Sequence, residues 1–510
     1  MSERKVRVRF APSPTGPLHM GGVRTALYNY LFAKKHGGDF ILRIEDTDQT
    51  RYVPGAEDYI IQALTWSKII PDEGQSVGGN YGPYRQSERK HLYRAYADQL
   101  IESGHAYYAF DTSEDLDKMR ELAKQAGTAN WQYNHVTRSH MKNSITLSAQ
   151  EVQERLDAGE PYVIRIKLPR NEEVKFEDII RGWVSVNTNN MDDKVLFKSD
   201  GMPTYHLANI VDDHLMEITH VIRGEEWLPS APLHILLYRY LGWEETRPQF
   251  AHLPLLLKPD GNGKLSKRDG DRLGFPVFPL QWKDPETDNI SSGYREQGYF
   301  SEAFINMLAF LGWNPGTEQE LFTMQELIDA FTLERVNKAG AKFDHEKTKW
   351  FNQQYLRKHS DKELGELLLP YLDAKGIHTD AEYAGKVASI MKERAYFVTD
   401  ILDEGMYFFE PPINYDEKTL EKKWNAESRM HVENLLHRFE ALEYFDSETL
   451  EKNFQDYLTE KETGFGKVGP GFRLAVTGQG MGASMFDICA ILGKQETVAR
   501  MRTALEKLPA

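Results

Sequence analysis

Two short motifs, far apart in the chain, combine residue types that bind phosphate. The first is His19-Met20-Gly21-Gly22, in which two glycines stand at the start of a predicted helix. Glycine lets a nucleotide approach the backbone closely, and the free amides and the dipole of a helix N-terminus attract phosphate. The imidazole of His19 could donate to a phosphate oxygen as charge develops there. Taken alone, the motif is also compatible with a glycine-rich turn beside an incidental histidine.

The second motif is the basic cluster Lys264-Leu265-Ser266-Lys267-Arg268, which glycines flank on both sides. A flexible basic loop can close on a pyrophosphate leaving group and stabilise the charge that develops on it. Alone, the cluster would be interpreted as a solvated surface loop. Because both motifs occur in one chain, we expect them to hold the triphosphate of one ATP from two sides.

The residues around the first motif change from a strand period to a helix period. Residues 5–10 alternate apolar and charged side chains, which is typical of a strand. Apolar residues at 23–31 follow a helical spacing, the glycines at 37–38 end this helix, and residues 40–44 resemble a second strand. This βαβ pattern predicts a parallel sheet that binds its ligand at the carboxyl edge.

The chain of 510 residues is too long for one ordinary domain. A predicted helix at 113–125 and short alternating strands such as 162–166 interrupt the α/β pattern, and helices dominate from residue 350 onward. The predicted fold class is therefore α/β: a Rossmann-like parallel-sheet catalytic domain with an α+β insertion, followed by an all-α region. The expected parts are 1–110 (first half of the sheet domain), 111–195 (insertion), 196–270 (second half, with the basic loop), 271–345 (connecting region) and 346–510 (helical region).

Bulk composition limits the classes of protein. The net charge of −15 argues against binding of polyanions by the whole surface, although local basic patches can still bind nucleic acid. The single cysteine, Cys489, allows no intramolecular disulfide and no cysteine-based zinc site, and we expect it to fill a core. The N-terminus leads into no apolar signal core, and no run approaches the roughly 20 apolar residues of a membrane span. We expect a cytoplasmic protein without membrane contact.

Further segments make the two motifs part of a known pattern. Together they resemble the class I aminoacyl-tRNA synthetases, in the glutamyl branch, over nearly the whole chain. Gly22 stands where other class I branches carry a second histidine, which is usual in this branch. The resembling segments are 9–16 (RFAPSPTG, the first strand and loop), 43–48 (RIEDTD, the edge of the second strand), and 205–214 (YHLANIVDDH) with 221–227 (VIRGEEW), the later pocket strands.

The resemblance implies an amino-acid pocket and an ATP site. A site that selects glutamate over glutamine needs permanently charged cations, and arginine offers two parallel donors to a carboxylate. Each assignment has a structural alternative: Arg9 as a surface strand residue, for example, or Glu45 paired with Arg51. The implied glutamate-binding residues are Arg9, Ala11, Ser13, Glu45 (for the α-ammonium), Tyr205, Asn209 and Arg223. The implied ATP-binding residues are Thr15, His19, Gly21, Gly22, Lys264, Ser266 and Lys267, of which His19, Lys264 and Lys267 would be catalytic.

The reaction implied by the resemblance has two steps. The α-carboxylate of L-glutamate attacks the α-phosphate of ATP, which binds with Mg²⁺ as a substrate complex, and a terminal ribose hydroxyl of tRNA(Glu) then takes the glutamyl group. Residues 111–195 would bind the acceptor end, and the helical C-terminal region, typical of the bacterial type, would bind the anticodon. We expect a monomer. Activation in this branch generally also needs bound tRNA, which completes the pocket.

Two acidic segments resemble metal-ligand spacing but are expected to be structural. Asp46-Thr47-Asp48 is better interpreted as strand-end capping or an acceptor-strand contact, and the family role of Asp212-Asp213-His214 looks structural. Some relatives bind zinc through a cysteine-rich cluster in the insertion, whereas the corresponding segment here, around residues 107–110, has no cysteine. We predict no metal site and no zinc.

Four other functions are weighed against this prediction. A tRNA-modifying paralogue would end after the catalytic part, and a glutaminyl enzyme would carry β-barrels where this chain predicts helices. A nucleotidyltransferase acting on a small acid without tRNA would leave the helical region unexplained. A non-catalytic RNA-binding protein would require degenerate ATP motifs, and both motifs look intact. Whether tRNA(Gln) is also charged with glutamate stays open.

Overall fold

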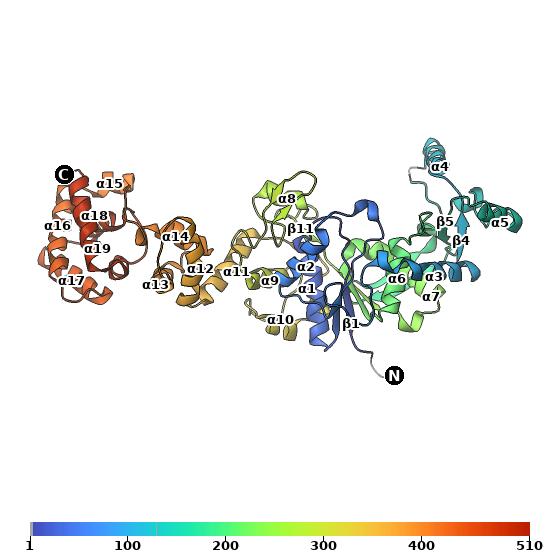
Figure 1. Cartoon of the computed structure of the whole chain (residues 1–510), viewed down its shortest axis with the longest axis horizontal. Helices are drawn as coiled ribbons and strands as arrows, with labels where there is room; N and C mark the ends of the chain where they lie inside the picture. The colour runs from blue at the N-terminus through green and yellow to red at the C-terminus, as the bar shows by residue number, and fades with distance from the viewer. Residues whose placement is uncertain (1–3, 129, 510) are drawn as a thin grey trace. The chain divides into compact units, whose positions relative to one another are not determined.

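The computed structural model describes residues 4–128 and 130–509, and the side chains of these residues apart from Lys267, Arg268 and Asp271. The chain forms two compact units. The N-terminal unit comprises residues 1–297 and 301–348, and the C-terminal unit comprises residues 298–300 and 349–510. Figure 1 shows strands in the first of these and helices in the second. Each unit is described by itself.

The N-terminal unit is built on parallel strands, as the βαβ pattern predicts. Strands β1, β2 and β3 pair in that order, with α1 and α2 as the connections, and β9 pairs in parallel with β10 in a second sheet of order β7-β6-β10-β9. The two sheets meet where the backbone N–H of Thr219 donates to the carbonyl of Arg7, 2.9 Å away. These elements are β1 (Arg7–Phe10), α1 (Met20–Lys35), β2 (Asp39–Leu42), η1 (Gln49–Arg51), α2 (Ala56–Trp66), β3 (Glu73–Gly74), β6 (Glu173–Asp178), β7 (Gly182–Asn187), β9 (His220–Gly224), α7 (Ala231–Tyr240) and β10 (Gln249–Leu253).

Residues 205–214, which the resemblance assigned to a pocket strand, form a helix instead. Helix α6 spans Tyr205–Leu215. Its buried side chains include Leu207, Ile210 and Val211, whose spacing of three and four residues places them on one helical face. The assignment to a strand was therefore wrong, although the segment still reaches the cavity described below.

The insertion contains a small antiparallel sheet that does not follow the expected boundaries at 111 and 195. The sheet has the strand order β4-β5-β8, so that β4 begins before the first boundary and β8 crosses the second. The hairpin of β6 and β7, which also lies within 111–195, belongs to the sheet of β9 and β10. These elements are η2 (Gln86–Arg89), α3 (Lys90–Glu102), β4 (Ala106–Ala109), α4 (Ser113–Gln125), η3 (Thr137–His140), α5 (Ala149–Asp157), β5 (Val163–Ile166), η4 (Thr188–Asn190) and β8 (Val195–Phe197).

The rest of the N-terminal unit carries the basic loop and short helices. Strand β11 pairs in parallel with β14, and β12 pairs with β13 as an antiparallel hairpin. The elements are η5 (Glu225–Ser230), η6 (Glu244–Thr246), β11 (Leu256–Leu257), α8 (Lys267–Leu273), β12 (Trp282–Lys283), β13 (Ile290–Ser291), α9 (Ser301–Ala309), α10 (Met324–Ala330), η7 (Leu333–Arg335) and β14 (Ala341–Lys342), followed by α11 (His345–Lys358).

The C-terminal unit is helical throughout the residues that the structure describes, and it has its own core. That core includes Leu364, Leu435 and Phe472, each at most 1% exposed. Cys489 lies in the same core, where burial raises the pKa of its thiol to about 12, which confirms its predicted role as core filler. Across residues 4–128 and 130–509, no helix is both long and apolar enough to cross a membrane. The helices of the C-terminal unit are residues 349–358 of α11, α12 (Asp361–Ala374), α13 (Ala381–Met391), α14 (Val398–Gly405), η8 (Met406–Phe408), α15 (Glu417–Lys423), α16 (Ala426–Ala441), α17 (Ser447–Glu460), α18 (Phe465–Thr477) and α19 (Met485–Lys507).

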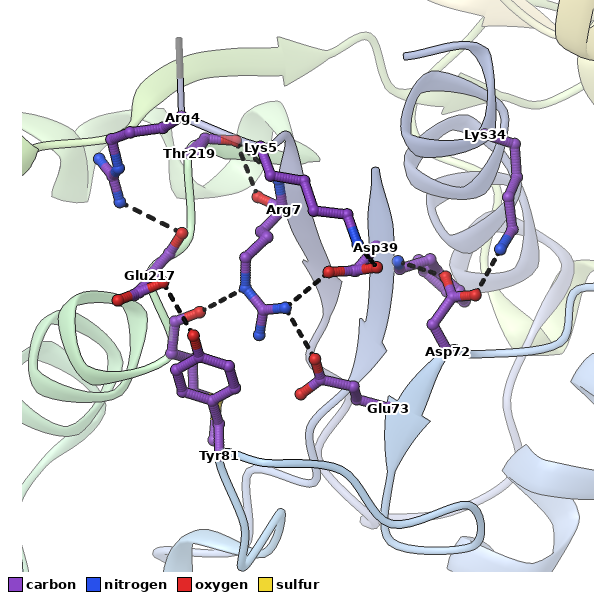
Figure 2. A network of polar contacts seen from close by, with 12 residues as sticks. Arg4, Lys5, Arg7, Lys34, Asp39, Asp72, Glu73, Tyr81, Glu217 and Thr219 are labelled. Carbon is purple, nitrogen blue, oxygen red and sulfur yellow. Dashed lines mark hydrogen bonds and ion pairs between the residues drawn. The ribbon is translucent and has the colours of Figure 1, made fainter. Parts of the chain in front are cut away.

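A network of charged side chains fixes the amino ends of the first three strands (Figure 2). The guanidinium of Arg7 on β1 donates to Asp39 on β2 at 2.8 Å and to Glu73 on β3 at 2.7 Å. Its Nε donates to the carbonyl of Met216, and its Cζ atom lies 4.2 Å from the ring centre of Tyr81. Because this network holds the amino ends of the strands, their carboxyl ends are left to form the binding site at the other edge of the sheet.

Candidate active site

A cavity of about 770 Å³ lies at the carboxyl ends of β1, β2 and β9. The structure brings together nearly all of the predicted site residues there, although they come from segments more than 200 positions apart. Ser266 is not among the lining residues, and the side chain of Lys267 lies outside the described residues. The predicted residues that line the cavity are Arg9, Ala11, Ser13, Thr15, His19, Gly21, Gly22, Glu45, Tyr205, Asn209, Arg223 and Lys264.

His19 is the N-cap of α1, and its ring packs against Gly21. The backbone N–H of Gly21 donates to His19 Nδ1 at 2.8 Å, so the proton of the neutral ring is on Nε2. A Cβ atom at Gly21 would lie 2.6 Å from His19 Cε1, and one at Gly22 would lie 2.4 Å from Leu18 Cδ1. The glycines are therefore needed to seat His19 and Leu18, a reason that the sequence pattern alone does not reveal.

Arg9 is a buried residue of the cavity wall, so the alternative of a surface strand residue was wrong. Its side chain is 3% exposed, and its Nε and Nη2 donate to the carboxylate of Asp213 at 3.0 and 3.2 Å. Arg43 donates to the same carboxylate at 2.7 Å. Burial would raise the pKa of Asp213, but the two guanidinium charges hold this pKa below its ordinary value. Asp213 thus has the structural role expected for its segment.

Glu45 forms its ion pair with Arg43 rather than with Arg51. The carboxylate accepts from Arg43 at 2.9 Å and from the side-chain amide of Asn209 at 3.2 Å, and it is 8% exposed. This arrangement leaves a fixed negative charge at the cavity wall, close to the buried arginines. A carboxylate in this position is suited to bind an ammonium group.

Arg223 on β9 is held by aromatic and imidazole side chains. It is 5% exposed, and its Nη1 donates to the hydroxyl of Tyr205 at 2.8 Å. Its Nε donates to His252 Nε2 at 3.1 Å, and Nη1 lies 3.4 Å from Nδ1 of His234. Neither histidine belongs to one of the motifs described above. The available signal was a titratable residue inside an apolar run, as in Ala251-His252-Leu253.

The basic loop is anchored by its apolar residue and by a helix cap. Leu265 is 1% exposed, and its N–H donates to the carbonyl of Leu256 at 2.8 Å. Ser266 caps α8, because its hydroxyl and N–H both donate to Asp269, at 2.5 and 2.9 Å. These two hydrogen bonds lower the pKa of Asp269 far below its ordinary value. Lys264 is exposed and pairs with Glu226 at 3.2 Å.

The acidic segment 46–48 has partners within the protein. Asp46 accepts from the N–H and the hydroxyl of Ser87 at 2.8 and 2.6 Å, and Asp48 caps η1 by accepting from the N–H of Thr50. Among residues 4–128 and 130–509, no three His, Cys, Asp or Glu side chains are grouped so that they could hold a metal ion. The arrangement of the cavity therefore offers arginines and a carboxylate at one end and a helix N-terminus with His19 and Lys264 at the other.

Comparisons with known proteins agree with this arrangement. The family described as tRNA synthetases class I (E and Q), catalytic domain, matches residues 5–350, and the family described as anticodon binding domain matches residues 363–505. A glutamate–tRNA ligase of Parabacteroides distasonis is 57% identical over 509 residues, which is 100% of both chains. A glutamate–tRNA ligase of Cytophaga hutchinsonii is 58% identical over 505 residues, covering 99% of this chain and 98% of the relative.

Solved structures are similar over the same extent. The crystal structure of a glutamate tRNA ligase from Elizabethkingia meningosepticum, in complex with its amino acid, has a TM-score of 0.96 and 51% identity, and the match covers 99% of this chain and 100% of that one. The glutamate-tRNA synthetase of Elizabethkingia anophelis has a TM-score of 0.93, 51% identity and the same coverage, 99% and 100%. The family match over residues 5–350 and these full-length similarities establish that the chain belongs to the class I tRNA synthetases of the E and Q type.

Proposed function

We propose that this chain is a glutamate–tRNA ligase. The observation that carries the proposal is one cavity whose lining includes the buried guanidinium groups of Arg9 and Arg223, the buried carboxylate of Glu45 and residues of both phosphate-binding motifs. Full-length relatives with 57% and 58% identity that are named glutamate–tRNA ligases support it. The enzyme activates L-glutamate with ATP to give glutamyl-adenylate and pyrophosphate, and then transfers glutamate to the 3′ end of tRNA(Glu).

Glutamate binds through charge complementarity. Arg223 and Arg9 bind its carboxylates, Glu45 binds the α-ammonium, and Tyr205 and Asn209 contribute polar contacts. Ala11 and Ser13 line the same edge of the cavity. Glutamine presents a neutral amide in place of the side-chain carboxylate, so it gains less from the buried guanidinium groups.

ATP binds across the N-terminus of α1. Thr15, Gly21 and Gly22 lie under the phosphates, Ser266 lies in the basic loop, and Mg²⁺ arrives with ATP as part of the substrate. In the first step the glutamate α-carboxylate oxygen bonds to the α-phosphorus, and the bond from that phosphorus to the bridging oxygen of pyrophosphate breaks. His19, Lys264 and Lys267 stabilise the charge on the departing pyrophosphate. Neither step uses a protein nucleophile, because positioning and electrostatics carry the rate.

The tRNA binds at two distant places on a monomeric, cytoplasmic enzyme. Residues 111–195 bind the acceptor end, and the helices of residues 346–510 bind the anticodon, reading unstacked bases by stacking and edge contacts. The match of residues 363–505 to the anticodon binding domain family supports the second assignment. This match also argues against a tRNA-modifying paralogue, because such an enzyme would end after the catalytic domain. The proposed reaction uses no zinc ion.

Pyrophosphate exchange tests the activation step. Labelled pyrophosphate is incubated with ATP and the enzyme, with glutamate or glutamine, and with or without tRNA(Glu). We expect label in ATP only when glutamate and tRNA are both present, because bound tRNA completes the pocket by induced fit. Exchange with glutamine would contradict the assigned specificity. Glutamate-dependent exchange that is unaffected by tRNA would favour a nucleotidyltransferase that acts on a small acid.

A further inference from the structure

Three buried residues on adjacent strands form a row that ends at Arg223. Asp178 lies at the end of β6, His252 lies on β10 and Arg223 lies on β9, with His252 and Arg223 in register. Asp178 is 1% exposed and His252 is 0% exposed. Asp178 Oδ2 lies 2.6 Å from His252 Nδ1, and Arg223 Nε lies 3.1 Å from His252 Nε2. Sheet pairing therefore connects a carboxylate to the predicted glutamate-binding guanidinium through one imidazole.

The partners of His252 determine which ring nitrogen carries the proton. Arginine has only donors, so His252 Nε2 must accept the hydrogen bond from Arg223 Nε. The proton of the ring is consequently on Nδ1, from which it donates to Asp178. A proton on Nε2 would face the N–H of Arg223, and both groups would then be donors. Burial and the charge of Arg223 lower the pKa of His252 although Asp178 opposes this, which agrees with a neutral ring.

The two oxygens of Asp178 have different partners, so the orientation of the carboxylate is fixed relative to the His252 ring. Oδ1 accepts from the backbone N–H groups of Ile180 at 3.0 Å, Arg181 at 2.9 Å and His252 at 3.3 Å. Oδ2 faces the His252 ring. In an Asp178→Asn variant the three N–H groups would keep the amide oxygen at the Oδ1 position, so the amide NH₂ would face His252 Nδ1. That donor would drive the ring proton to Nε2, opposite Arg223.

We propose that Asp178 and His252 are positioning residues that hold Arg223 in the orientation in which it binds the glutamate carboxylate. The pair fixes the ring proton on Nδ1, and Nε2 then accepts from Arg223 Nε, while the outer guanidinium nitrogens donate to the hydroxyl of Tyr205 and to the carbonyl of Trp227, at 2.8 and 3.3 Å. This inference rests on the proposed function, because it assigns a role within the glutamate pocket. Neither residue lines the cavity, so each acts through Arg223.

Two substitutions at position 252 separate the two hydrogen bonds of the ring. The amide of Asn reaches about as far as Nδ1 and can still donate to Asp178, but it leaves Arg223 Nε without an acceptor. The amide oxygen of Gln reaches about as far as Nε2 and can accept from Arg223. We expect His252→Asn to raise the KM for glutamate about tenfold or more and His252→Gln to raise it less than about threefold. The KM for ATP should change less than about twofold in both.

A double-mutant cycle tests the tautomer directly. We expect Asp178→Asn to raise the KM for glutamate at least as much as His252→Asn, because it inverts the ring proton, an effect that amide replacement of a buried Asp–His pair has elsewhere. The His252→Gln variant has no imidazole whose proton could move between nitrogens. Adding Asp178→Asn to it should therefore change the KM for glutamate less than about threefold. His220→Asn, on the same strand as Arg223 but paired with Thr219, is the matched control and should leave both KM values unchanged.

¹⁵N NMR of the full-length enzyme labelled with ¹⁵N-histidine determines the tautomer of His252 in the absence of substrate. The His252 signal, assigned by its loss in His252→Gln, should show a protonated Nδ1 in the wild type and a protonated Nε2 in Asp178→Asn. The proposal is overturned if the wild-type proton is on Nε2, if His252→Asn and His252→Gln raise the KM for glutamate equally, or if ATP is affected as much as glutamate. A wild-type enzyme that charges no tRNA with glutamate would refute the proposed function instead, and the NMR experiment would still decide the tautomer.

Discussion

At the scale of single residues, the charged groups of the proposed glutamate pocket are held in place by partners within the protein. Arg9 and Arg223 are 3% and 5% exposed, and each is bound from its buried side, Arg9 by Asp213 and Arg223 by His252. A guanidinium that is already ordered and partly desolvated loses little further entropy when it binds a carboxylate. The partners of the two arginines differ in charge. Asp213 compensates the charge of Arg9, whereas the neutral imidazole of His252 leaves the charge of Arg223 uncompensated and available to a substrate carboxylate.

Replacing Arg223 by lysine tests this use of the guanidinium. Arg223→Lys keeps the charge but loses the fixed donors to Tyr205 and His252, so we expect the KM for glutamate to rise about 100-fold, equivalent to about 2.7 kcal/mol. The measurement is steady-state charging at varied glutamate. Arg239→Lys is the control, because Arg239 pairs with Glu172 and does not line the cavity. Equal KM values for glutamate in Arg223→Lys and wild type would show that Arg223 does not bind glutamate.

Gly21 provides a test of how His19 is seated. A Cβ at this position would lie 2.6 Å from His19 Cε1, so Gly21→Ala must displace the imidazole. We expect kcat for activation to fall about tenfold or more, because the proposed role of His19 is to stabilise the charge of the transition state, while the KM for glutamate changes little. Gly466→Ala is the matched control, since a Cβ there meets no atom within 4 Å. Retention of full kcat in Gly21→Ala would show that the position of His19 is unimportant.

At the scale of elements, the amino ends of β1, β2 and β3 depend on the network of Figure 2. The Arg7 side chain is 7% exposed, and its two partners, Asp39 and Glu73, are 17% and 12% exposed. Arg7→Met would leave these carboxylates poorly compensated, so we expect the N-terminal unit to lose about 3 kcal/mol of stability. Hydrogen exchange of peptides from β1 and β2, measured in increasing urea, reports this loss.

Lys5→Met serves as the control for that experiment, because Lys5 is 59% exposed and its pair with Asp39 should contribute less than about 1 kcal/mol. The two variants should charge tRNA normally when folded, since the network is at the opposite end of the strands from the cavity. A change of less than about 0.5 kcal/mol for Arg7→Met would mean that the network does not hold the sheet.

His220, at the start of β9, makes the stability of the sheet of β7, β6, β10 and β9 depend on pH. Burial, with help from the charges of His36 and Arg4, lowers its pKa from 6.5 to about 4. Below pH 6.5 the unfolded chain binds a proton that the folded chain does not, so the contribution to stability is complete above pH 6.5 and is lost as the pH falls toward 4.

We therefore expect wild type to lose more stability than His220→Asn between pH 7.5 and pH 5, by about 2 kcal/mol at most. Hydrogen exchange of peptides from β9 and β10, measured in increasing urea at both pH values, gives this difference, and the contribution of carboxylates that titrate in both proteins cancels in the comparison. Identical pH dependence in the two proteins would mean that His220 is accessible to protons in the folded state.

Elements also show what the sequence could predict. The alternation of Val8 and Phe10 with charged residues predicted β1, and the βαβ pattern predicted a ligand site at the carboxyl edge of the sheet, where Arg9 near the end of β1 and Glu45 after β2 lie. By contrast, the pairing of β6 with β10 joins residues that are some 70 positions apart, and no local pattern encodes it. Asp178 and His252 could not be linked to Arg223 without that pairing, which is why these partners emerged only from the structure.

At the scale of the whole molecule, the two units have separate cores, one around the parallel strands and one among the C-terminal helices. The family matches follow the same division, with residues 5–350 in one and 363–505 in the other. A division of this kind suits an enzyme that must bind one tRNA at two distant places. Under the proposed function, the 160 residues that follow residue 350 serve to bind the anticodon rather than to activate glutamate.

The most direct test of the account is charging of purified tRNA(Glu) and tRNA(Gln), each with labelled glutamate and labelled glutamine in parallel, in the presence of ATP and Mg²⁺. We predict that glutamate is attached to tRNA(Glu) and that glutamine is attached to neither tRNA. Glutamate on tRNA(Gln) as well would define a non-discriminating enzyme within the same account. Transfer of glutamine, or no charging of either tRNA by the wild-type chain, would contradict it.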